Sequence, residues 1–110
     1  MSAHNFEKLL LEAVDEGLST VGESSKQVIY FHLEKTFNIK RQDIPQKIEE
    51  FADAIEKIFG LGAKVLETQI MEQLHRKIRH AIKYAQEPKN LVFTEYIAAT
   101  RQTFLKKTKK

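Results

Sequence analysis

The chain has 110 residues, no cysteine and a formal net charge of +3, with 42% hydrophobic and 30% charged residues. This length and composition suit one globular domain with its own hydrophobic core, not a disordered chain. The lack of cysteine excludes a disulfide framework, a thiolate zinc site and a cysteine nucleophile. There is no signal-peptide pattern and no apolar run near the ~20 residues needed to span a bilayer, so we expect a cytoplasmic protein that makes no membrane contact.

Two helices are predicted in the first third of the chain. Apolar residues recur at helical spacing from Phe6 to Val21, and Gly22 is a natural terminator. Ser24 or Ser25 should cap a second helix that runs to about Phe37. After it, Asn38 tolerates the left-handed conformation that ends helices, and Ile39 can fold back as the accompanying apolar contact.

Two more helices are predicted between residues 43 and 84. Asp43 and Pro45 are expected to begin the third, because proline is harmless in a first helical turn. Gly60-Leu61-Gly62 then separates the third from the fourth and longest helix, about residues 63–84. The inner face predicted for the third helix is Ile44, Ile48, Phe51, Ala52, Ile55 and Phe59. That of the fourth is Leu66, Ile70, Leu74, Ile78 and Ile82, widened by Val65, Met71 and Ala81.

The C-terminal segment is ambiguous between helix and strand. Residues 91–97 are rich in strand-forming side chains, yet a lone strand would need a second subunit to pair with it. A helix is favoured, with an inner face of Phe93, Tyr96, Ile97, Thr100 and Phe104. The predicted fold class is therefore all-α: a compact bundle of four core helices plus a C-terminal segment that forms a fifth helix. One domain would cover residues 1–105, with a basic tail at 106–110.

Residues 6 to about 80 resemble a family of small archaeal helical signal-output domains, the Nitrosopumilus output domain type. The resemblance lies in GESSKQVIYFHLEKTF (22–37), in Ile44-Pro45 and in AIEKIFGLGAK (54–64). It implies a short module that acts by contact with another macromolecule. It supplies no catalytic residues, and the segment from about residue 85 onwards has no counterpart in it.

Charge is divided unevenly along the chain. Residues 1–62 hold 7 Lys and Arg against 11 Asp and Glu, a balance of −4, whereas residues 63–110 hold 11 against 4, a balance of +7. The sharpest local feature is a basic stripe at helical spacing on the fourth helix, with lysines in the tail. These cations could bind the phosphates of a nucleic acid, contact an acidic protein, or simply offset the dipole at the helix C-terminus and lie in water. The candidate nucleic-acid-binding residues are Arg76, Arg79, His80, Lys83, Lys106 and Lys107.

The second helix is apolar almost all round from Val28 to Leu33. Either it lies centrally in the bundle, or its second face meets another subunit. A symmetric dimer is the commonest arrangement for such a surface, so Tyr30 and Phe31 are the candidate self-association residues.

The remaining motifs favour structural roles. The third helix carries Glu49, Glu50, Asp53 and Glu56, which would repel a phosphate backbone, so it is not a major-groove reader. Gly60–Lys64 is preceded by no strand and lacks P-loop spacing, so it is expected to be a tight helix–helix turn. His75 and His80 are five apart, not the four that suit a zinc pair on one helical face. We predict no metal, no cofactor and no enzymatic activity.

The sequence therefore favours a non-enzymatic regulatory or signal-output module that acts by macromolecular contact as a homodimer, with an unidentified protein partner. The alternative is a nucleic-acid-binding protein that uses the basic stripe and the tail.

Overall fold

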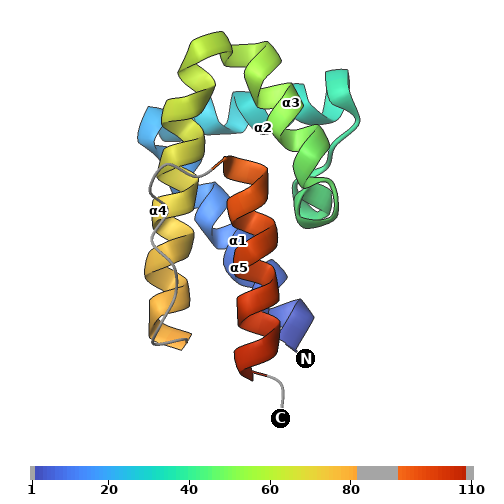
Figure 1. Cartoon of the computed structure of the whole chain (residues 1–110). Coiled ribbons are helices and arrows are strands. Elements are labelled where there is room, and N and C mark those ends of the chain that lie inside the picture. Colours follow the sequence, from blue (N-terminus) through green and yellow to red (C-terminus); the bar gives the residue numbers. More distant parts are fainter. Residues whose placement is uncertain (1, 82–91, 109–110) are drawn as a thin grey trace.

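The computed structural model describes residues 2–81 and 92–108, with side chains described for 5–79 and 92–106 (Figure 1). Within these ranges the chain is all-α and contains no strand, which confirms the predicted fold class. The five α-helices are α1 (Ser2–Leu18), α2 (Glu23–Phe37), α3 (Ile48–Phe59), α4 (Ala63–Ala81) and α5 (Phe93–Thr108). Short 3₁₀ helices connect them: η1 (Ser19–Val21), η2 (Arg41–Gln46) and η3 (Gly60–Gly62).

Helices α1, α4 and α5 pack together as the main group of the fold (Figure 1). Helices α4 and α5 run in the same direction, with α1 packed against both and running the opposite way. Helix α2 crosses near one end of this set, and η3 turns the chain sharply from α3 into α4. The most extensive helix–helix contact is between α1 and α4, so this pair is the centre of the fold.

The predicted apolar stripes form the core. In α4, Leu66, Ile70, Leu74 and Ile78 are all buried, and the corresponding α1 residues Phe6, Leu10, Ala13, Val14 and Leu18 are fully buried. Helix α5 buries Phe93, Tyr96, Ile97, Thr100 and Phe104, every position predicted for a helix there. It packs on α1, α3 and α4 of its own chain.

Glycine at position 17 permits the closest approach between α1 and α4. A Cβ atom at this position would lie 2.5 Å from Ile70 Cγ1 and 2.9 Å from the Ile70 backbone nitrogen. Backbone atoms cannot move aside as a flexible side chain can, so any larger residue would force the helices apart. Helical periodicity alone does not indicate this packing role of Gly17.

The helix ends agree with the sequence in one case and differ in two. Asn38 adopts the left-handed conformation (φ 58°), and the Ile39 amide donates to the Leu33 carbonyl at 3.0 Å with Ile39 buried, as predicted. The predicted serine cap is wrong: Ser24 and Ser25 lie inside α2, and Gly22 (φ 102°) occupies the N-cap. The predicted start of the third helix at Asp43 and Pro45 is also wrong, because these residues form η2 and α3 begins at Ile48.

Two further expectations need adjustment. Val65 does not widen the inner face of α4, since it is 64% exposed. Residues 106–108 continue α5 to Thr108, whereas the sequence predicted that a tail begins at Lys106. Ile82 and Asn90, predicted respectively as a core residue and a helix cap, lie outside the described residues.

We expect Gly17→Ala to destabilise the fold by about 1–3 kcal/mol, because the added methyl overpacks the α1–α4 crossing. Urea unfolding followed by circular dichroism would measure the change. Gly62→Ala is the matched control: its Cβ would come no closer than 3.7 Å to another atom, and its φ is not positive. Equal destabilisation of both variants would contradict the close-crossing account.

Candidate interaction surfaces

Basic side chains from other elements pair with the acidic face of α1. Lys77 of α4 lies 2.9 Å from Glu16 Oε2 and 3.6 Å from Glu12 Oε1. Arg101 of α5 lies 3.8 Å from Glu7 Oε2, donates to the Pro45 carbonyl at 3.0 Å, and stacks its guanidinium 5.0 Å from the centre of the Phe6 ring. Each contact is partly exposed and weak alone, but together they fix α4, α5 and η2 against one helix.

Asp15 is the centre of the most connected polar cluster. Its carboxylate accepts a hydrogen bond from the Tyr30 hydroxyl of α2 and two from the Arg41 guanidinium of η2, the one from Nε at 3.0 Å. Partial burial alone would raise the pKa of Asp15, but the hydrogen bonds from Arg41 and Tyr30 outweigh it and hold that pKa below its ordinary value. Burial and the same contact raise the pKa of the Tyr30 hydroxyl.

These contacts account for part of the uneven charge division. Glu7, Glu12 and Glu16 belong to the acidic first half, and their partners Lys77 and Arg101 belong to the basic second half. These pairs thus cancel part of the charge difference between the two halves inside the domain. The charges that are not paired in this way are the more available to another molecule.

The structure describes the side chains of three candidate nucleic-acid-binding residues. Arg76, Arg79 and Lys106 are exposed, and none of them forms an ion pair within the described part of the chain. Because α4 and α5 run in the same direction, all three lie towards the same end of the bundle (Figure 1). Lys77, their neighbour in sequence, is instead paired with α1, and His75 is 7% exposed. His80 and Lys107 lie in helices but their side chains are outside the described set, as is the whole of Lys83.

Tyr30 and Phe31, the candidate self-association pair, have different environments. Tyr30 is half-buried and its hydroxyl is bound to Asp15, so it holds α2 to the domain. Phe31 is 63% exposed and Val28, one turn before it, is 64% exposed. These two side chains form an apolar patch on the outer face of α2, which we call the α2 face. It borders a hollow of about 590 Å³ towards Arg41 and Gln42 of η2.

The sequence left open whether α2 lies centrally in the bundle or has a second, uncovered face. Helix α2 is not central: it packs mainly on α3 and η1, and its inward residues are Ile29 and Leu33. Its second apolar face is therefore not covered by any part of the chain that the structure describes.

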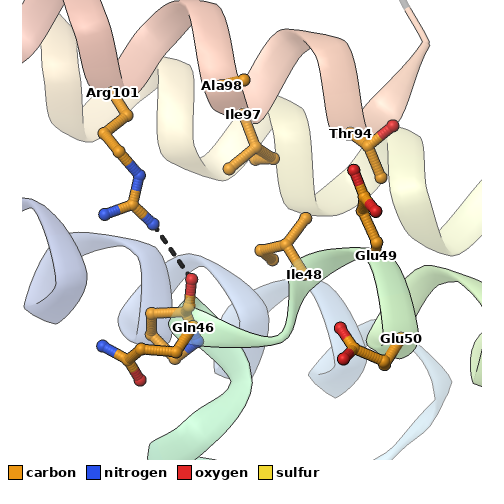
Figure 2. A pocket seen from close by; sticks show the side chains of 9 residues that line it. Gln46, Ile48, Glu49, Glu50, Thr94, Ile97, Ala98 and Arg101 are labelled. Carbon is orange, nitrogen blue, oxygen red and sulfur yellow. Dashed lines mark hydrogen bonds between the residues drawn. The ribbon is translucent and has the colours of Figure 1, made fainter.

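A second hollow, of about 290 Å³, lies between α5 and the η2–α3 segment (Figure 2). Ile48 and Ile97 face each other across it, the hydrogen bond from Arg101 closes one end, and Glu49 and Thr94 lie at the other. This hollow could not be predicted from helical periodicity, because it is formed by segments about 50 residues apart in the sequence. The acidic face of α3, noted only as unfavourable for binding phosphate, was the available signal.

No metal-binding group of three or more His, Asp or Glu side chains occurs among the residues that the structure describes. Over the same residues, no helix has both the length and the apolarity to cross a membrane. Comparison of the chain with protein-family models, with curated proteins and with solved structures gave no significant match.

We expect Asp15→Asn to lower the free energy of unfolding at neutral pH by about 1–2 kcal/mol, since hydrogen bonds to a charged group are stronger than those to a neutral one. The pKa of Asp15 is lowered by folding, so its contribution is complete above the unfolded-state value of about 3.9 and is lost as pH falls through the lower folded-state pKa.

Urea titrations from neutral to acidic pH would therefore converge for the wild type and Asp15→Asn at the acidic end. Asp53→Asn is the control, because Asp53 is exposed and has no ion-pair partner in the described ranges. A constant difference between wild type and Asp15→Asn at all pH values would contradict the assigned role of the charge.

Proposed function

We propose that this chain is a non-enzymatic regulatory module that acts by macromolecular contact and self-associates as a homodimer through the α2 face. The observation that carries the proposal is the exposure of Val28 and Phe31 on the outer side of a helix whose inner side is already packed. Exposed apolar pairs are common, but here they continue into a hollow beside η2, which gives a partner side chain a place to enter.

The charge around the α2 face is compatible with a second copy. Glu34 and Lys35 flank the patch, so it carries both signs, and the Lys35 ammonium lies 5.8 Å from the centre of the Phe31 ring. A symmetric interface brings the same patch from both subunits together, and a patch with a large net charge would repel its copy. The α2 face has no such excess.

The signal-output role rests on the resemblance to archaeal output domains, whose most extended phrase, residues 22–37, contains α2. A cytoplasmic location fits such a role. In that setting, dimer formation or release would be the output, and the α2 face would be the surface that a signal exposes or covers.

We expect Phe31→Glu to weaken self-association at least about 30-fold without unfolding the domain, because Phe31 is exposed and a buried interfacial charge is costly. Sedimentation equilibrium would measure the dimer dissociation constant, and urea unfolding would confirm the fold. Tyr30→Glu is not a clean probe, because it would also break the hydrogen bond to Asp15.

Leu61→Glu is the matched control, an apolar-to-acidic change at a residue that is 91% exposed in η3. Equal effects of Phe31→Glu and Leu61→Glu, or a wild-type chain that remains monomeric at high concentration, would refute the dimer proposal.

Nucleic-acid binding is the second candidate. The observation that favours it is that Arg76, Arg79 and Lys106 are exposed and lie towards one end of the bundle, on two helices that run in the same direction (Figure 1). These three side chains form no ion pair with the residues that the structure describes, so they can contact phosphates without breaking such a pair. Their position at helix C-termini is also where the dipole favours cations in the absence of a ligand.

As a nucleic-acid binder, the chain should bind random-sequence duplex DNA or single-stranded RNA at about 50 mM salt and lose this affinity steeply by about 200 mM. Replacing both Arg76 and Arg79 with Ala should weaken binding to all sequences and reduce the slope of log affinity against log salt by about 2. Lys57→Ala, which removes an exposed cation from α3, should leave affinity nearly unchanged. Absence of binding at low salt would eliminate this candidate.

A further inference from the structure

Three neighbouring hollows lie in a row beside α5 and share lining residues. The hollow in Figure 2 shares Glu49 and Thr94 with a second of about 280 Å³ between α3, α4 and the start of α5. The second shares Glu56, Glu67 and Phe93 with a third of about 440 Å³ that reaches Met71 of α4. We call this row of hollows the α5 groove; it is separate from the α2 face.

The rims of the α5 groove are acidic. Five carboxylates line it: Glu49, Glu50, Asp53, Glu56 and Glu67. None of them forms an ion pair within the described ranges, whereas all four carboxylates on the acidic face of α1 do so. Burial, and after it the charge of Glu56, raises the pKa of Glu67. Several neighbouring carboxylates on this side of the domain therefore have no ion-pair partner among the residues that the structure describes.

Two basic groups line the groove, and they do not balance its five carboxylates. Arg101 is already engaged by the Pro45 carbonyl and Glu7. Lys64 lines the third hollow together with Glu56 and Glu67, and its charge acts to lower the pKa of Glu67. The positive end of the α5 dipole stabilises the charge of Glu49, which points towards Thr94 (Figure 2). One lysine against five carboxylates leaves an excess of negative charge, and Asp53, Glu56 and Glu67 all line the second hollow.

The floor of the α5 groove is apolar. Ile48 and Ile97 form it at one end, and Phe93 and Met71 at the other. Val92, at the start of α5, is 58% exposed and lines both the second and the third hollow. A floor of this kind accepts apolar side chains from a ligand while the rims contact its charges.

We propose that the α5 groove binds a basic amphipathic segment of a partner protein, whose apolar side chains cover Val92 and whose lysines or arginines contact Asp53, Glu56 and Glu67. Charge complementarity selects this occupant: an acidic segment or a nucleic acid would be repelled, and an uncharged apolar segment would leave the rim carboxylates without counter-ions. This goes beyond the proposed homodimer, because it involves a different surface and a different molecule.

The test measures fluorescence anisotropy of a labelled synthetic Lys/Leu peptide of about 14 residues, which forms roughly four helical turns. We expect binding by the wild-type chain, and about a fivefold to tenfold loss of affinity in the double variant Asp53→Asn/Glu56→Gln. Val92→Ser should weaken binding about threefold or more, because it removes the exposed apolar contact. A Lys/Ser peptide of equal charge should bind much more weakly.

The double variant Glu72→Gln/Glu95→Gln is the matched control, since it removes two exposed carboxylates that line neither the groove nor the α2 face. The proposal is overturned if both double variants lose affinity equally, or if the two peptides bind alike, since either result means nonspecific charge attraction. It also fails if the groove variants change sedimentation of the chain and leave peptide affinity intact, because a second copy would then be the occupant. Phe31→Glu should not alter peptide binding, so failure of the dimer and of the groove can be told apart.

Discussion

The close crossing of α1 and α4 is the constraint on which the rest of the fold depends. Only glycine at position 17 leaves room for the Ile70 backbone, and the apolar stripes of both helices are buried from this crossing towards their far ends. Helix α5 and η2 then pack on α1, so a change in the α1–α4 distance would also shift the elements that contact these two helices. The polar contacts follow this geometry: Lys77 reaches Glu12 and Glu16 because the two helices already lie side by side.

This arrangement also decides which charges are available to partners. The carboxylates of α1 form ion pairs with cations of their own domain, while those of α3 and the start of α4 form none among the residues that the structure describes. Negative charge therefore remains along the α5 groove, and positive charge remains at Arg76, Arg79 and Lys106. The division along the sequence, −4 against +7, is thus partly cancelled inside the fold and partly preserved on two separate surfaces.

Local sequence signals predicted the helices well and their ends less well. Apolar spacing identified the buried residues of α4 and α5, and Asn38-Ile39 identified the end of α2, because these signals act within one or two turns. Pro45 misled because a 3₁₀ turn accommodates proline as readily as the first turn of an α-helix does. Contacts such as Arg41 with Asp15 or Arg101 with Pro45 join residues 26 and 56 positions apart, and no periodicity encodes them.

The two aromatic residues of α2 show that local sequence signals are also limited in predicting candidate site residues. From sequence, Tyr30 and Phe31 were equivalent members of an aromatic pair, yet a rotation of about 100° per residue places them in different environments. Tyr30 turns towards Asp15 and joins α2 to α1, whereas Phe31 turns outwards. A helix fixed by a polar anchor on one side can present an apolar patch on the other without that patch being needed for folding. Phe31 therefore lies outside the buried core, and a substitution there should have little effect on the stability of the fold.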